Sequence, residues 1–143
     1  MKNASIAIAV TALTYAMPCA AVQCNLGVQG VAFGAYDVFS FQSLDSTGNI
    51  AVTCDMSTPY TIALSAGQGS YGSRWLASGP YRLNYNLFTD ASRATVWGDG
   101  TGGSSTVPGS SASTNFTVFG RIAARQNAHV GIYGDSVTVT LTF

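Results

Sequence analysis

Cysteines are the residues of this sequence with the clearest chemistry. The 143-residue chain has three, Cys19, Cys24 and Cys54, together with one histidine, His129. These residues do not form the close cluster of thiolates and imidazoles that a zinc site needs, so we expect no metal. In an oxidising compartment, Cys24 and Cys54 are predicted to form a disulfide bond. Closing the loop between them would stabilise the fold by roughly 3–4 kcal/mol.

The acidic residues do not suggest catalysis. All six are aspartates, and no two stand at a spacing typical of general acid–base pairs. Most belong to turns, whereas Asp37 and Asp135 stand at predicted strand boundaries and are candidates for buried hydrogen-bond acceptors. The glycine-rich run 98–103 lacks the Gly-Lys-Ser/Thr ending of a phosphate loop and any following helix. We therefore expect neither an enzyme nor a bound cofactor.

Two tryptophans are candidates for a binding surface. Trp75, Leu76 and Trp97 are expected in loops, where indole rings can stack on sugars or make adhesive contacts. The plainer interpretation is that these side chains cover an edge of the core. Both interpretations stay open at the level of the sequence.

Composition and the N-terminal segment indicate a secreted protein. Charged residues make up 8% of the chain, which argues against nucleic-acid binding. Residues 1–21 are predicted to be a secretory signal peptide, because Lys2 precedes an apolar stretch, 6–16, that is too short to span a membrane. Small residues at positions 19 and 21 suit cleavage after Ala21. The mature chain, 22–143, would form one domain and would retain an even pair of cysteines.

The mature chain consists of short alternating runs separated by turn residues, a pattern typical of an all-β sandwich. The clearest run is 135–143, in which alternate residues share one apolar face: Val137, Val139, Leu141 and Phe143. Further strands are expected at 27–33, 36–39, 50–54, 60–64, 82–88, 96–97 and 116–122, with a turn at 46–49 and loops at 65–73 and 98–113. Alternation places three groups of side chains in the core: Ile50, Val52 and Cys54; Tyr60, Ile62 and Leu64; Leu83, Tyr85 and Leu87.

Seven pieces of sequence form a recognisable pattern in this order: Cys24, then 33–37, 48–54, 83–90, 96–100, 120–122 and 131–143. Together they resemble the spore coat protein U domain, which is shared with subunits of archaic chaperone–usher pili. The resemblance covers essentially the whole mature chain. Each piece alone is weak, but all seven in order with both cysteines form a specific signal.

The resemblance implies an incomplete immunoglobulin-like β-sandwich that lacks its final strand. In such subunits the last strand of the chain borders an open apolar groove, here lined by Val137, Val139, Leu141 and Phe143. A periplasmic chaperone fills the groove first, and in the fibre a donor strand from a neighbouring subunit replaces it. The implied partners are that chaperone, an outer-membrane usher and other pilus subunits, and the implied location is the cell surface.

The sequence departs from fibre-forming subunits at its N-terminus. Those subunits carry a donor extension of a dozen or so residues before the first cysteine. Cleavage after Ala21 would leave only Val22 and Gln23, which cannot reach a neighbour's groove at roughly 3.3 Å per residue. A subunit that accepts a strand but donates none can only end a fibre, so we expect a tip position.

Three functions remain open from the sequence. The first is a structural pilus subunit acting in adhesion or biofilm formation. The second is a coat component of the spore coat U type. The third is a secreted carbohydrate-binding module that uses Trp75 and Trp97.

Overall fold

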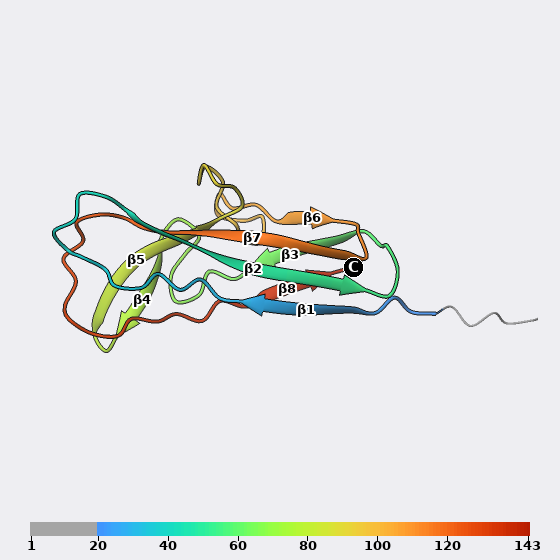
Figure 1. The fold of residues 1–143 in the computed structure, drawn as a ribbon, viewed down its shortest axis with the longest axis horizontal. Helices are drawn as coiled ribbons and strands as arrows, with labels where there is room; N and C mark the ends of the chain where they lie inside the picture. The colour runs from blue at the N-terminus through green and yellow to red at the C-terminus, as the bar shows by residue number, and fades with distance from the viewer. Residues whose placement is uncertain (1–19) are drawn as a thin grey trace, which may run out of the picture.

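Eight β-strands and no helix make up the part of the chain that the computed structural model describes, residues 20–143 (Figure 1). The strands are β1 (Cys24–Gln29), β2 (Leu44–Cys54), β3 (Tyr60–Leu64), β4 (Arg74–Ser78), β5 (Tyr81–Phe88), β6 (Val107–Gly109), β7 (Ser113–Ile122) and β8 (Val139–Thr142). None of the described residues belongs to a helix that could cross a membrane. The predicted signal peptide falls almost entirely on residues 1–19, which lie outside the described part. The prediction of an all-β fold is confirmed.

The strands form two antiparallel sheets. The larger has the order β1-β2-β7-β5-β4 and the smaller has the order β6-β3-β8. The longest pairing joins β2 to β7 in a continuous register from Leu44↔Ile122 to Thr53↔Ser113. Figure 1 shows the strands running along an elongated molecule, with the loops around residues 30–43 and 123–138 gathered at one end. The C-terminus lies toward the other end.

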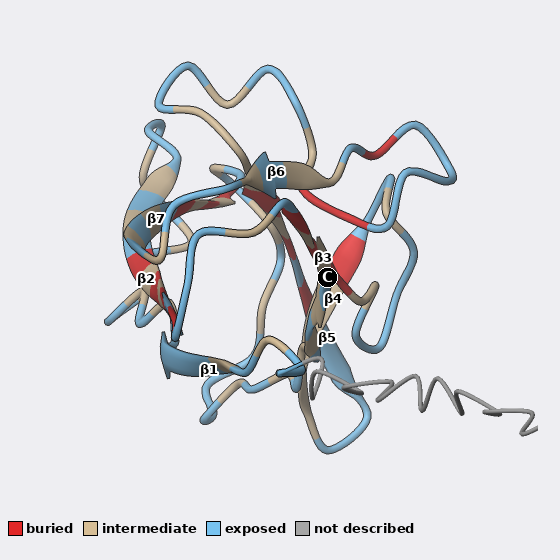
Figure 2. Ribbon diagram, turned by 90° about the vertical axis from the view of Figure 1, so that its right-hand side faces the viewer, coloured by how far each residue is buried: buried red, intermediate tan, exposed pale blue. Residues whose placement is uncertain are grey.

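The core lies between the sheets, where the alternation of the sequence placed it. All three predicted groups of inward-facing side chains are buried, joined by Trp97, Val118 and Ile122. Burying each large apolar side chain contributes roughly 1.5–3 kcal/mol, so these positions supply most of the driving force for folding. Figure 2 shows the buried segments on facing strands of both sheets.

The predicted turn at residues 46–49 is wrong, because these residues lie within β2 and pair with β7. Turn-forming residue types occur here for another reason. The chain leaving β1 crosses directly over Gly48, and a Cβ at this position would lie 2.6 Å from the carbonyl oxygen of Gln29. Glycine therefore permits close packing inside a strand instead of ending the strand.

Strand boundaries at the N-terminal side also differ from expectation. The first strand was expected at 27–33 but is β1, and its pairing with β2 begins at Cys24↔Cys54. Residues 36–39 form a turn instead of a strand, because the Asp37 carboxylate accepts a hydrogen bond from the Phe39 amide (2.9 Å). Asp37 is exposed, so its predicted burial is also wrong.

The segment around the tryptophans is more ordered than expected. Trp75 and Leu76 belong to β4, not to a loop. Trp97 makes isolated β-bridge contacts and is 1% exposed, and its indole Nε1 donates a hydrogen bond to the Ile62 carbonyl oxygen (3.1 Å). It is a core residue, which corrects its assignment to an adhesive or sugar-stacking loop.

The predicted disulfide bond is confirmed. Cys24 and Cys54 are joined, and the bond links the first residue of β1 to the last residue of β2. The bond therefore fixes one end of β1. Among the described strands of its sheet, β1 pairs with β2 alone.

Candidate functional site

The candidate site begins with the free edge of β8. On its inner side, β8 pairs with β3, and just before it the Ser65 amide donates to the Thr138 carbonyl oxygen (2.9 Å). Backbone groups in antiparallel strands point alternately to either side. The N–H and C=O groups of Val137, Val139 and Leu141 therefore face away from β3, where no described strand lies beside β8.

The outer edge of β1 also presents backbone groups with no described strand beside them. The Asp55 amide donates to the Gln23 carbonyl oxygen (3.0 Å), which fixes the alternation along the β1–β2 pair. The backbone groups of Cys24, Leu26 and Val28 consequently face away from β2. β1 ends the order of the larger sheet, so this edge is also free in the described part of the chain.

Side chains that face inward from β1 are nevertheless exposed. Leu26 and Val28 lie opposite Val52 and Ile50 in the β1–β2 register, so all four share one face of the sheet. Val52 and Ile50 are each 1% exposed, whereas Leu26 is 36% and Val28 55% exposed. The β1 side chains thus point toward the interior of the sandwich, at a position that no described strand covers.

Two adjoining cavities lie along this opening. The smaller, about 360 Å³, is lined from both sheets by residues that include Val28, Ile50, Leu64, Leu87, Val137 and Val139. The larger, about 730 Å³, lies between residues 31–39 and 128–135. Both include Val31, Phe33, Leu76 and Asp135 in their linings, so they form one apolar groove with two compartments. Figure 2, a view along the long axis, shows β1 well apart from the C-terminus.

The four predicted groove residues occupy different parts of this opening. Val137 and Val139 line the smaller cavity. Leu141 continues the half-buried row along β8, and Phe143 is exposed just beyond the strand. The structure thus places the four along one segment but brings only two of them to a cavity.

One polar group stands at the junction of the two compartments. The Asp135 carboxylate accepts hydrogen bonds from the Tyr85 hydroxyl (2.6 Å) and the Gln68 amide (3.1 Å), which bears out its prediction as an acceptor. Burial, and then this hydrogen bond, raises the pKa of the Tyr85 phenol, so it remains a donor at neutral pH. This contact connects the segment that precedes β8 to β5 of the larger sheet.

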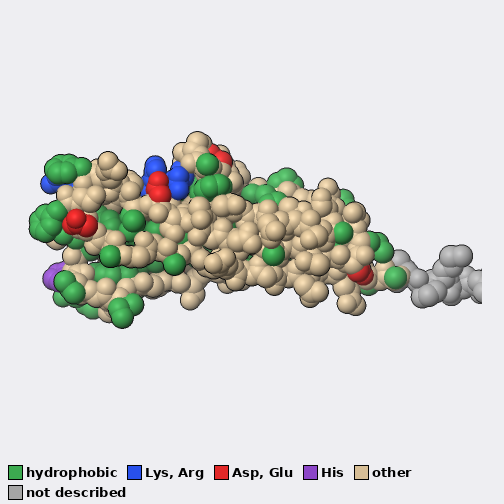
Figure 3. Space-filling model, viewed as in Figure 1, with side chains coloured by type: hydrophobic (Ala, Val, Ile, Leu, Met, Phe, Trp, Pro, Cys, Tyr) green, Lys and Arg blue, Asp and Glu red, His purple; other side chains and the backbone are tan. Residues whose placement is uncertain are grey.

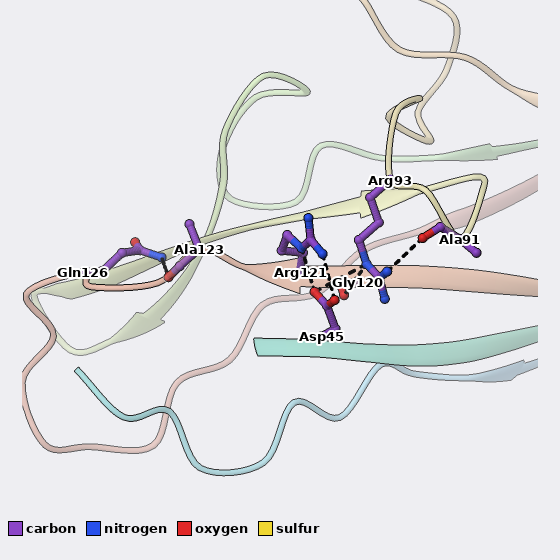
Figure 4. Close-up of polar contacts among 7 residues, drawn as sticks. All are labelled: Asp45, Ala91, Arg93, Gly120, Arg121, Ala123 and Gln126. Atoms are coloured by element: carbon purple, nitrogen blue, oxygen red, sulfur yellow. Dashed lines mark hydrogen bonds and ion pairs between the residues drawn. The ribbon is translucent and has the colours of Figure 1, made fainter. Parts of the chain in front are cut away.

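The ion pairs among residues 20–143 involve Asp45, Arg93 and Arg121 and lie outside the groove. Figure 4 shows Asp45 on β2 held by Arg121 on β7 through two hydrogen bonds of 2.7 and 2.8 Å, with Arg93 3.4 Å away. The hydrogen bond from Arg121 lowers the pKa of the Asp45 carboxyl. Within residues 20–143, no cluster of His, Cys, Asp or Glu is suited to hold a metal ion.

The exposed apolar surface lies elsewhere than predicted. Trp75 is half-buried beneath the Arg82 guanidinium, 4.1 Å from its ring centre, and Leu76 faces the cavities. The most exposed large apolar side chains are in two loops and are each more than 80% exposed: Phe39, Phe41, Val130 and Ile132. Figure 3 shows hydrophobic side chains gathered at the end of the molecule where these loops lie. The exposure of these four side chains was not predicted from the sequence, because Phe, Val and Ile are enriched in β-strands.

Comparison with known proteins places this geometry in context. Protein U of Myxococcus xanthus is 32% identical over 128 residues, an alignment covering 78% of this chain and 70% of the relative. A chain in the crystal structure of the CsuC–CsuE chaperone–tip adhesion subunit pre-assembly complex, from archaic chaperone-usher Csu pili of Acinetobacter baumannii, superimposes with a TM-score of 0.62. That match has 24% identity and covers 86% of this chain but only 40% of the other. The E. coli Hda pilus minor tip subunit, HdaB, gives a TM-score of 0.48 at 15% identity over 82% of this chain and 79% of that one.

The match to the chain from the CsuC–CsuE complex shows a shared fold, and the family match goes further. The Spore Coat Protein U domain matches residues 9–140, which is nearly the full length. The resemblance read from the sequence is thereby confirmed: this chain belongs to the Spore Coat Protein U domain family.

Proposed function

We propose that this protein is a secreted structural subunit of an archaic chaperone–usher pilus that accepts a β-strand in the groove between β1 and β8. One observation carries the proposal. Leu26 and Val28 face the interior beside buried Val52 and Ile50, yet remain exposed because no strand of residues 20–143 covers them. A strand inserted here would bury these side chains and pair with unsatisfied backbone groups on both edges.

The identity of the occupant follows from the shape of the opening. Two free edges line one apolar groove, which suits an extended segment with alternate apolar residues. A periplasmic chaperone would supply this segment first, and a neighbouring subunit would replace it during assembly through an outer-membrane usher. The structural match to a chain of a chaperone–subunit pre-assembly complex supports a chaperone as a partner. Without an occupant, the open edges would promote aggregation.

Adhesion and position in the fibre form the finer part of the proposal. Phe39, Phe41, Val130 and Ile132 give one end of the molecule an apolar surface suited to contact with another surface. A tip position follows if the signal peptide is cleaved after Ala21, since the remaining segment is too short to donate. N-terminal sequencing of the exported protein tests this. A mature start at or before Leu13, or purified subunits that polymerise with themselves, would contradict the tip position.

Chaperone capture tests the proposed function directly. The exported chain should be soluble and monodisperse when co-expressed with its cognate chaperone, and should aggregate without it. Deleting residues 141–143 should abolish co-purification while export continues, and the milder Phe143→Ala should weaken it. A stable monomer that needs no partner, or capture at full yield after the deletion, would refute strand acceptance.

A coat component remains the second candidate, because the matched family takes its name from a spore coat protein. Adjacent genes for a usher and a chaperone would favour the pilus, and their absence would favour the coat. A carbohydrate-binding module loses support, since Trp97 is buried and cannot stack on a sugar.

A further inference from the structure

The row of side chains beside the groove has one charged member. From Tyr133 to Val139, half-buried residues alternate with exposed ones, so Asp135 faces the groove together with Val137 and Val139. Among the described residues that line the smaller cavity, Asp135 alone is charged, and it also lines the larger cavity. Any strand bound along the groove must therefore pass a carboxylate.

This carboxylate is held rigidly. One oxygen, Oδ1, accepts from the amides of Gln68 (3.1 Å) and Ser136 (2.8 Å), and the other, Oδ2, accepts from the Tyr85 hydroxyl (2.6 Å). Gly67, with φ of 61°, packs against it so closely that a Cβ at that position would overlap the carboxylate. Asp135 therefore cannot turn away when a strand arrives.

The hydrogen bonds leave one acceptor position unused. A carboxylate has about four lone-pair sites, and three are occupied here, which leaves one on Oδ2. In the open groove, water can use that site. An apolar side chain placed over it would remove the water and supply no donor in return, which is costly for a charged group.

We propose that Asp135 is a specificity-determining residue of this groove. The bound strand must place a hydrogen-bond donor such as serine opposite Asp135, and apolar side chains opposite Val137 and Val139. A slip of two residues would bring an apolar side chain onto the carboxylate, so Asp135 also fixes the register of the strand. This inference rests on the proposed function, since it presumes that a strand binds here.

A strand attached to the chain itself provides the test. The backbone of Phe143 faces the free edge by the same alternation as Val139, so an Asn-Gly turn after Phe143 can fold an added strand back along β8. The first added strand residue then lies opposite Phe143, the fifth opposite Val139 and the ninth opposite Asp135. Odd-numbered residues would be valine and even-numbered ones threonine, except where varied.

Thermal unfolding would be compared for two versions of the extended full chain, with serine or valine at the ninth added position. The serine version should have the higher midpoint, on the order of 5 °C above the valine version. The matched control makes the same exchange at the fifth position, opposite Val139, where valine should be the better residue. In an Asp135→Asn background, the preference for serine at the ninth position should vanish, because no charge remains to be desolvated.

The outcomes separate the two levels of inference. If neither version is stabilised relative to the chain with an all-threonine extension, strand acceptance itself fails. If both are stabilised but serine and valine are equivalent at the ninth position, or Asp135→Asn keeps the serine preference, the role of Asp135 is overturned. A preference for serine at the ninth position that vanishes in Asp135→Asn, together with a preference for valine at the fifth position, supports the role.

Discussion

The four sheet edges of this sandwich divide into two protected and two open ones. At the edge of β4, Ala77 and Gly134 exchange backbone hydrogen bonds of 2.9 and 3.0 Å, so another segment of the chain already occupies part of that edge. The edge strand β6 has three residues and contains Pro108, which has no N–H to offer. The edges of β1 and β8 have neither device and line one apolar groove.

Under the proposed function, this difference means that pairing with other chains is directed to the two open edges. Protecting two edges limits strand addition to the other two edges. There, burial of the apolar groove side chains would favour binding of an incoming strand. The protected side also contains the buried Arg74, which donates to the carbonyl oxygens of Ser65 and Trp97. On the open side, β1 and β8 each pair with one strand, and the disulfide bond and the Asp135–Tyr85 contact add to that pairing.

The largest effect should come from dismantling the protected side. Arg74→Met removes the donors to the Ser65 and Trp97 carbonyl oxygens, which would lose their partner in the interior, and one of the two donors to Asn86 Oδ1. We expect the free energy of unfolding to fall by about 4 kcal/mol, measured by urea denaturation of the protein after its release from the chaperone. The control is Arg82→Met, whose stacking on Trp75 should contribute less than about 1 kcal/mol. Equal effects would show that Arg74 does not anchor this side.

Removing the disulfide bond that holds β1 should cause the next largest loss of stability. Replacing Cys24 and Cys54 together by serine removes the disulfide cross-link between β1 and β2 and should cost about 3 kcal/mol of folding stability. The same denaturation experiment measures it. Thiol labelling of the denatured wild-type protein provides the check, and two free thiols without reductant would contradict the disulfide.

Blocking the open side should impair capture but leave the fold intact. Val139→Asp puts a charge into the cavity, whereas Thr140→Asp, one residue along the same strand, puts it on the exposed face. We expect the first change to lower chaperone affinity about tenfold, or about 1.4 kcal/mol, and the second to have little effect. Pull-down with the cognate chaperone measures the difference. If the two variants behave alike, β8 does not present its inward face to the partner.

A contact remote from all four edges should matter least. Arg121 lowers the pKa of Asp45, so the folded state gains stability above the ordinary carboxyl pKa and loses it as pH falls through the lowered value. Because the pair is exposed, Asp45→Asn should cost less than about 1 kcal/mol at pH 7. Denaturation at pH 7 and pH 3 should show the difference between variant and wild type shrinking at the lower pH. A gap that grows on acidification would contradict this assignment.

Sequence reasoning located the core better than the surfaces. Strict alternation identified the inward faces of β3 and β5, because burial on one side of a strand leaves a period of two. It failed at Gly48, where glycine serves close packing, and at Arg74, since an arginine is rarely fully buried. Phe39 and Ile132 look like strand residues, and only the tertiary structure shows that they are exposed. The junction role of Asp135 depends on Tyr85, fifty positions away, and no local pattern encodes that contact.

The long register between β2 and β7 has a kinetic consequence. It joins residues 44–53 to residues 113–122, so the central pairing of the larger sheet cannot form until most of the chain has been exported. Sheets dominated by such distant pairings fold slowly, because the entropy of closing a large loop is lost before the stabilising contacts form. During that delay the apolar strands are unsheltered and prone to misassembly. A partner that binds β8 as it emerges would therefore act during folding itself, and not only on the finished subunit.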